Sequence, residues 1–153
     1  MFFSFYSKNI SFEGELLYMH DEYSLIYEPN FTNAGLGISC GTYTELNVIY
    51  ETCDIVHISG LSPKNSWIIK TMNIPKAKRG RLWVHIENLP MEGMCLEYGK
   101  LWDTYYDEEK QYICIGDYCT DDYDDCAEFA NNLIAVLRGG NLIAVWAKIK
   151  EVQ

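Results

Sequence analysis

A repeated apolar phrase near the C-terminus is the feature that most limits how this chain can fold. The letters NLIAV occur at residues 132–136 and again at 141–145, and the letters LRGG separate the two copies. Gly139 and Gly140 readily adopt the positive φ angles that a two-residue turn requires. The repeat therefore predicts a β-hairpin that turns at these two glycines.

The predicted hairpin has a definite register. If Gly139 and Gly140 form the whole turn, Leu137 faces Leu142, and further along the strands Leu133 faces Trp146. Both faces of the two strands are apolar, a pattern typical of strands in the middle of a sheet with other layers on each side. We therefore expect the hairpin to be covered on both faces and to serve as scaffold.

A helix over residues 121–138 is the alternative interpretation of this region. Thr120 would cap such a helix, and Gly139 would end it. Asp121 and Asp122 would lie in its first turn, where the helix dipole favours negative charge. The paired asparagines and the β-branched residues of the repeat oppose a helix, because they favour turns and strands. The hairpin is the favoured interpretation.

The rest of the chain favours short strands. Segments with alternating or β-branched apolar residues are separated by polar or glycine-rich breaks. The predicted strands are 12–19, 23–28, one or two strands within 43–59, 82–89, 94–102 and 111–117. The predicted loops and turns are 30–42, 60–67, 75–81 and a polar hairpin at 103–110. We predict one α+β domain over residues 1–153, a predominantly antiparallel β meander with a C-terminal hairpin and little helix.

Charge is distributed unevenly along the chain. The net charge is −10, and residues 101–128 contain ten of the 22 acidic residues. By contrast, residues 62–86 carry Lys and Arg but no acid. This excess of negative charge disfavours nucleic acid as a ligand, because the phosphates would be repelled, and it favours a basic partner.

Membrane and export signals are weak. No apolar run approaches the roughly 18 residues that would span a bilayer. The opening letters MFFSFYSK form too short an apolar stretch for a signal peptide and lack a basic leader. We therefore expect a cytoplasmic protein with no membrane partner.

Cysteine and acid spacing argues against metal and cofactor sites. None of the six cysteines forms a C-x-x-C pair, so we expect free and mostly buried thiols. The acidic run at 116–125 does not place its carboxylates at the spacing of a calcium loop. No nucleotide-binding or hydrolase motif occurs, and we expect no cofactor, no metal and no catalytic residue.

Tyrosines interleaved with acids mark the candidate partner-binding residues. Exposed tyrosine offers rigid apolar area, and carboxylates accept charge-assisted hydrogen bonds from Arg and Lys. The alternative is that these tyrosines and acids only form solvated acidic turns and bind no partner. The candidates are Tyr105, Tyr106, Asp107, Glu108, Glu109, Asp121, Asp122, Tyr123, Asp124 and Asp125.

The chain resembles small bacterial immunity proteins of polymorphic-toxin and contact-dependent growth-inhibition systems. The similar features lie within residues 43–148: a turn from Pro63 to Trp67, the strand ICIGD at 113–117, and a terminal segment that reads AEFA, IAVL and LIAVW. The resemblance implies a non-catalytic protein that binds a cognate toxin C-terminal domain, often a nuclease, and blocks it inside the producing cell. An acidic surface would complement the basic cleft of such a nuclease.

Two other classes of function stay open at this stage. The chain could be a small enzyme or ligand-binding domain that uses Cys95 with His57 or His85, provided that the fold brings these groups together. It could also be a subunit of a larger assembly that associates through an apolar edge strand.

Overall fold

The chain is almost entirely β-structure in the computed structural model, which describes residues 1–7, 13–29, 34–99 and 101–153. Strands hold 60% of the residues and helix only 2%. Within the described ranges, the helical residues form one 3₁₀ turn at Lys64–Ser66. The prediction of an α+β class is therefore wrong, although the expectation of little helix agrees with this content. No helix among the described residues has the length and apolar character needed to cross a membrane.

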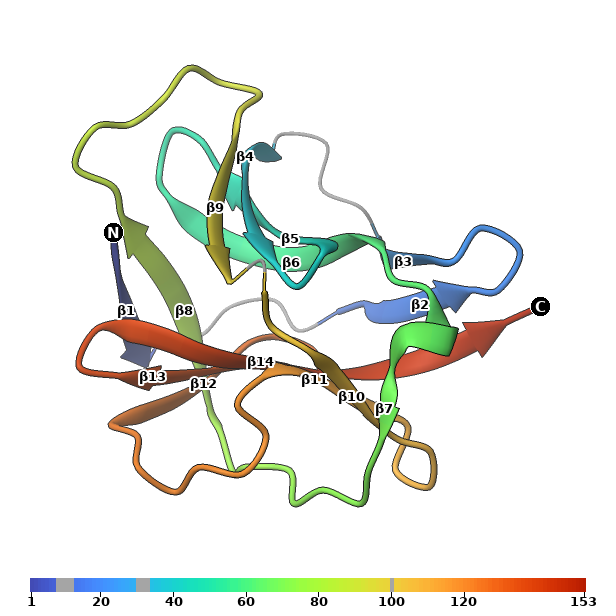
Figure 1. The fold of residues 1–153 in the computed structure, drawn as a ribbon. Helices are drawn as coiled ribbons and strands as arrows, with labels where there is room; N and C mark the ends of the chain where they lie inside the picture. The colour runs from blue at the N-terminus through green and yellow to red at the C-terminus, as the bar shows by residue number, and fades with distance from the viewer. Residues whose placement is uncertain (8–12, 30–33, 100) are drawn as a thin grey trace.

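In the described part of the chain, fourteen strands make up one mixed sheet, whose arrangement Figure 1 shows. In chain order they are β1 (Phe2–Ser7), β2 (Glu15–Met19), β3 (Ser24–Glu28), β4 (Ala34–Cys40), β5 (Tyr43–Ile49), β6 (Asp54–Leu61), β7 (Ile68–Ile69), β8 (Lys78–His85), β9 (Cys95–Gly99), β10 (Thr104–Asp107), β11 (Tyr112–Gly116), β12 (Asp125–Ala130), β13 (Leu133–Arg138) and β14 (Asn141–Val152).

The sheet is not a simple antiparallel meander. Hairpins such as β2–β3, β4–β5 and β10–β11 are antiparallel, but β14 runs parallel to β2, β4 to β9, β12 to β8 and β10 to β7. β8 connects two parts of the sheet. Its first residues pair with β12, with Lys78 opposite Ala127, and its later residues pair with β6, with Leu82 opposite Ile55. Strands β8, β12, β13, β14, β2, β3 and β6 therefore form a closed ring.

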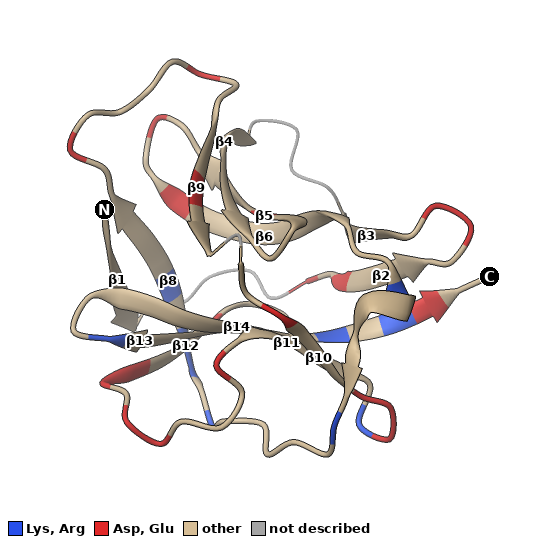
Figure 2. Cartoon of the chain, in the orientation of Figure 1, with Lys and Arg blue, Asp and Glu red and all other residues tan. Residues whose placement is uncertain are grey.

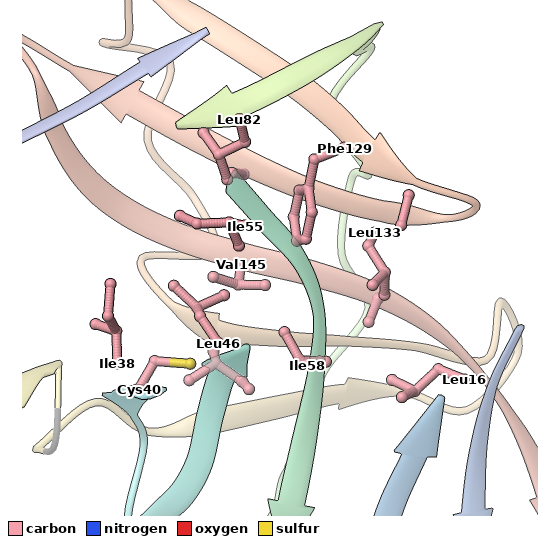
Figure 3. Close-up of a cluster of buried hydrophobic side chains, with 14 of the residues drawn as sticks. Leu16, Ile38, Cys40, Leu46, Ile55, Ile58, Leu82, Phe129, Leu133 and Val145 are labelled. Carbon is pink, nitrogen blue, oxygen red and sulfur yellow. The ribbon is translucent and has the colours of Figure 1, made fainter. Parts of the chain in front are cut away.

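The larger hydrophobic core lies inside this ring. Side chains from β2, β4, β5, β6, β8, β12, β13 and β14 point toward one another there, as the labelled residues in Figure 3 show. Leu16, Ile38, Leu46, Ile58 and Leu133 are all at most 1% exposed. Each such side chain contributes about 1.5–3 kcal/mol when it leaves water. We call this cluster the first core.

The terminal hairpin forms as predicted and turns at the two glycines. Gly139 and Gly140 have φ angles of 56° and 80°, the pair of positive values that a type I′ turn requires. Leu137 lies opposite Leu142, as expected. The same pairing excludes the alternative helix over residues 121–138, because β12 and β13 occupy that region.

The register beyond Leu137 differs from the prediction. A β-bulge at Ile143 adds one residue to β14, so Val136 pairs with Ala144, and Trp146 pairs with Ile134 instead of Leu133. The extra residue moves Trp146 to the opposite face of the sheet. The repeated phrase predicts equal spacing on both strands, and nothing in it marks where a residue is inserted.

The bulge sorts the hairpin side chains into two separate cores. Leu133, Leu137 and Val145 face the first core. The other face forms a second core with side chains from β11, β12, β13 and β14 and from a segment before β8: Met72, Cys114, Cys126, Ile134, Val136, Ala144 and Trp146. The expectation that the hairpin is covered on both faces is confirmed.

Several predicted strands are confirmed, and others were missed. The predicted strand 23–28 corresponds to β3, the region 43–59 divides into β5 and β6, and 82–89 overlaps β8. The predicted strand 12–19 corresponds to β2, and its first residue lies outside the described residues. β1 and β12 are not predicted by the sequence pattern. The predicted turn 75–81 contains the first residues of β8, and the predicted polar hairpin 103–110 contains β10.

The predicted loop 30–42 is also partly wrong. Residues 30–33 lie outside the described part, but Ala34–Cys40 form β4 between β5 and β9. Gly37 explains why a glycine-rich segment becomes a strand here. A Cβ at this position would lie 2.7 Å from the Glu45 carboxylate and 3.3 Å from Cys95 Sγ. Glycine allows these neighbours to approach the strand closely.

We predict that Gly139→Val destabilises the protein by about 1–2 kcal/mol, because a β-branched residue is strained at positive φ. A Cβ at Gly139 would meet nothing within 4 Å, so the cost is one of backbone conformation and not of space. Gly139→Asn, which tolerates this conformation, is the matched control and should cost much less. Urea unfolding monitored by circular dichroism measures both, and equal losses for the two variants would contradict the turn assignment.

Candidate functional site

The candidate acidic residues lie at opposite ends of β11. Glu108 and Glu109 are exposed in the turn between β10 and β11, and residues 117–125, which we call the acidic loop, follow the other end of β11. Figure 2 shows these acidic segments apart from each other on the fold. The five residues of β11 separate them by about 17 Å. The sequence candidates therefore do not form one continuous surface.

Tyr106 and Asp107 are not available to a partner. Tyr106 is 2% exposed and belongs to the first core, where its ring lies 5.1 Å from the Trp67 ring. Asp107 is 3% exposed. The prediction that these two residues belong to a binding surface is therefore corrected, because β10 turns both side chains into the protein.

Asp107 instead holds a neighbouring segment in place. Its carboxylate accepts hydrogen bonds from the backbone N–H groups of Met72, at 2.9 Å, and Lys110, at 3.1 Å. Lys110 Nζ lies 3.6 Å from the same carboxylate and donates to the Met72 carbonyl. These donors lower the pKa of Asp107 below its ordinary value, the Met72 N–H contributing most. Asp107 thereby fixes residues 70–77, which we call the covering segment, against the second core.

The acidic loop is attached to the terminal hairpin at both of its ends. At its start, the Asp117 N–H donates to the Ile143 carbonyl at 3.0 Å. At its end, the Asp124 N–H donates to the Leu137 carbonyl at 2.9 Å, and the Asp124 carboxylate accepts the N–H of Gly139. The loop therefore has a defined position over the second core.

Short local hydrogen bonds shape the loop between these attachments. Asp117 Oδ1 accepts the Cys119 N–H at 3.1 Å, and Thr120 Oγ1 accepts the Asp122 N–H, also at 3.1 Å. Such side-chain-to-backbone bonds are how Asp and Thr stabilise turns. Arg138 Nη1 approaches Asp122 at 3.7 Å. Asp121, Asp122, Asp124 and Asp125 are all exposed, so the loop presents its negative charge to solvent.

A groove of about 370 Å³ lies between the covering segment and the acidic loop. Its floor consists of two buried residues of the second core, Val136 and Trp146. The rest of its lining comes from the two flanking segments: Thr71, Met72, Asn73, Ile74, Pro75, Asp117, Tyr118, Cys119, Thr120, Asp121 and Tyr123. We call it the acidic groove, and it is our candidate functional site.

Aromatic rings form a large part of the groove wall. Tyr118 lies against Tyr105, with ring centroids 4.4 Å apart, and Tyr123 packs against the second core. Lys70 Nζ lies 5.4 Å from the centroid of the Tyr118 ring, a cation–π contact. The groove therefore combines apolar rings with the carboxylates of Asp117 and Asp121 at its edge.

One side of this groove can be predicted from the sequence, and the other cannot. The alternation of acids and tyrosines predicts Asp121 and Tyr123 as binding residues. It does not predict the covering segment or Trp146, since no local pattern shows that residues 71–75 lie beside residues 117–123. The bulge at Ile143, which turns Trp146 toward the groove, also has no sequence signal.

The residues of the alternative enzyme hypothesis are not brought together. His57 on β6 pairs with Asn47 on β5, Asn47 pairs with Gly37 on β4, and Gly37 pairs with Cys95 on β9. His57 and Cys95 are therefore three strand spacings apart, or about 14 Å. His57 is 3% exposed and stacks on the ring of Tyr27, and burial lowers its pKa.

The remaining group of that hypothesis, His85, also lies elsewhere. It is exposed on β8 with its ring 4.7 Å from the ring of Phe2. All six cysteines are free thiols. No cluster of three or more metal-ligating side chains occurs within the described ranges.

A second groove, of about 490 Å³, lies where β2 and β11 approach β14. Its lining is mainly polar and includes Gln111, Asn131, Asn132, Lys148 and Lys150. Some of these polar side chains have a structural role. The Asn131 amide donates a hydrogen bond to the Gly14 carbonyl at 2.8 Å. Lys150 Nζ lies 3.6 Å from the Glu15 carboxylate.

We predict that Cys95 reacts slowly with iodoacetamide at pH 8 and that Glu45→Gln accelerates the reaction severalfold. Partial burial, followed by the hydrogen bond to the Glu45 carboxylate at 3.2 Å, raises the pKa of Cys95 to about 11 and suppresses the thiolate. Peptide mass spectrometry measures the rate. Glu97→Gln should accelerate the reaction less, because Glu97 raises the pKa of Cys95 through its charge and not through a hydrogen bond. A reaction rate unchanged by Glu45→Gln would contradict this account.

We further predict that Asp107 contributes to stability mainly above its ordinary pKa of 3.8. Its folded-state pKa lies below the unfolded value, so this contribution is present at higher pH and is lost as pH falls through the folded-state pKa. Urea unfolding from pH 6 to pH 2 should therefore show Asp107→Asn less stable than the natural chain, with a difference that shrinks in acid. A difference independent of pH would contradict the role of the carboxylate charge.

No protein-family model matches the chain, and no curated protein matches it either.

Proposed function

We propose that this chain is an immunity protein that neutralises a cognate toxin domain by binding it stoichiometrically inside the producing cell. The toxin surface it binds is basic, as expected of a nuclease that holds nucleic acid, and the mechanism is occlusion. The observation that carries the proposal is the acidic loop, whose exposed aspartates border a groove lined with aromatic side chains.

The chemistry of the acidic groove suits a protein partner. Hot spots of protein interfaces are enriched in Trp, Tyr and Arg, and they lie in well-packed pockets at the interface centre. Tyr118, Tyr123 and Trp146 provide the apolar area, and the aspartates provide acceptors for basic side chains.

The loop that carries these aspartates is already held in place. Its hydrogen bonds to Leu137, Gly139 and Ile143 fix its ends against the terminal hairpin. A loop that is ordered before binding loses less conformational entropy on complex formation than a free one. A flexible acidic tail would lose part of its binding free energy to the entropy cost of becoming ordered, and the acidic loop loses less in this way.

The overall charge supports the same partner. A net charge of −10 speeds the encounter with a positively charged protein, by about 10- to 1,000-fold where the charges are concentrated on facing surfaces. Rapid association suits an antidote, because the toxin must be captured before it reaches its target. The same charge repels nucleic acid, so the antidote does not compete for the substrate of a nuclease.

The binding partner can be tested directly. We expect the toxin domain encoded immediately upstream of the gene for this chain to bind one-to-one with a Kd in the nanomolar range, about −12 kcal/mol. Isothermal titration calorimetry measures both stoichiometry and affinity. An absence of binding at micromolar concentrations would overturn the proposed function.

The role of the acidic loop can be separated from that of total charge. We predict that the triple variant Asp121→Asn, Asp122→Asn and Asp125→Asn associates with that toxin domain at least about tenfold more slowly at low salt, because steering is lost. Asp124 is left intact since it holds Gly139. Stopped-flow fluorescence measures the rate.

A matched control carries the same change in net charge elsewhere. This control is the triple variant Asp21→Asn, Glu51→Gln and Glu87→Gln, whose three residues are exposed and lie away from the acidic loop. This variant should associate within about twofold of the natural chain, since steering depends on charges near the interface. Equal slowing of both variants would show that net charge, and not the loop, directs association.

A further inference from the structure

We propose that the acidic groove is a socket for one arginine side chain of the partner, inserted between the covering segment and the acidic loop. This inference rests on the proposed function and specifies which chemical group is recognised. The guanidinium would lie against the Tyr118 and Tyr123 rings, and the carboxylates of Asp117 and Asp121 would accept its N–H groups.

The volume of the groove and its buried floor fit an inserted side chain and not a flat interface patch. At about 370 Å³ it falls at the lower end of the range of small-ligand sites, about 300–1,000 Å³. Its floor is Val136 and Trp146, which are 3% and 2% exposed. Apolar contact at the floor suits the methylene stem of an arginine, which can bury its carbons while its head stays near water.

The lining favours arginine over lysine. A guanidinium is planar, so it stacks on aromatic rings, and its N–H groups can meet a carboxylate at two points. An ammonium is a strongly hydrated point charge that gains less from a stacked ring. The groove offers two tyrosine rings and two carboxylates within one cavity.

The protein itself places a cation on this aromatic wall. Lys70 Nζ lies 5.4 Å from the centroid of the Tyr118 ring, and the ring of Tyr105 supports Tyr118 from a centroid distance of 4.4 Å. Tyr118 thus already accepts a cation–π contact from Lys70, and an arginine in the groove would use the part of the ring that Lys70 and Tyr105 leave open. Tyr118 belongs to the acidic loop, so this one loop supplies both an aromatic ring and the carboxylates that a cationic occupant would contact.

The walls of the socket are held in place before binding. The Met72 N–H bond to Asp107 fixes the covering segment, and the Asp117 N–H bond to Ile143 fixes the start of the acidic loop. A preformed site loses little order when the ligand enters. The Asx turn that Asp117 forms with Cys119 uses Oδ1, which leaves Oδ2 as the acceptor for a partner.

The experiment uses a peptide probe and does not require the toxin. The ¹⁵N-labelled full chain is titrated with acetyl-Gly-Arg-Gly-amide, and ¹H–¹⁵N correlation spectra are recorded. We expect chemical-shift changes concentrated in residues 71–75 and 117–123 and in the Trp146 indole N–H, with a Kd of roughly 1–10 mM for so small a ligand. The citrulline peptide, which is isosteric but neutral, should bind at least tenfold more weakly, and the lysine peptide should bind more weakly than the arginine peptide.

Variants locate the site. Asp121→Asn should weaken peptide binding about three- to tenfold, and Thr71→Trp should block the groove while all aspartates remain. Glu109→Gln removes one charge at the opposite end of β11, and Asn88→Trp adds a tryptophan in the exposed loop between β8 and β9, away from the acidic loop (Figure 1). Both controls should bind the peptide as the natural chain does. Shifts spread over all acidic residues, or equal binding of arginine and citrulline peptides, would overturn the socket.

The outcomes separate this inference from the proposed function. Toxin binding in calorimetry without selective arginine binding in the groove refutes the socket and leaves the immunity proposal intact. Selective arginine binding without toxin binding refutes the immunity proposal and leaves a groove specific for arginine. If both bind, Thr71→Trp should weaken the toxin complex by at least tenfold while Asn88→Trp leaves it unchanged, and equal affinity of the two variants would overturn the socket.

Discussion

Burial of the terminal hairpin on both faces is the constraint on which the rest of the structure depends. β13 and β14 separate the first core from the second, so each residue of this hairpin must match a different environment from its neighbours. The bulge at Ile143 makes this possible, because it reverses the facing of Ala144, Val145 and Trp146 relative to an evenly paired strand. Without this reversal Val145 would leave the first core and Trp146 would enter it.

The same reversal links the fold to the candidate site. Trp146 forms part of the groove floor only because it faces the second core. The acidic loop attaches to the hairpin at Ile143, the bulged residue, and at Gly139 in the turn. The turn, the bulge and the groove are therefore one local arrangement in which scaffold residues determine where the charged residues lie.

Local structure can be predicted from the sequence where a local pattern has a single structural outcome. The Gly139-Gly140 pair predicts a primed turn because few other residues accept two positive φ angles. Such prediction fails where the conformation of a segment depends on residues that are distant in the sequence. Gly37 reads as a loop residue, yet it lies in a strand because Glu45 and Cys95 pack over it. Asp107 reads as a surface acid, yet it binds the N–H of Met72, which lies 35 residues earlier.

The order of the strands has a consequence for how the protein is made. β2 obtains its parallel neighbour, β14, only when residues 149–152 are available to pair with residues 16–19. β1 likewise pairs with β8, far along the chain. Such high contact order slows folding and leaves strand edges open during synthesis. The ring therefore cannot close on a nascent chain until residues 149–152 have left the ribosome and can pair with residues 16–19.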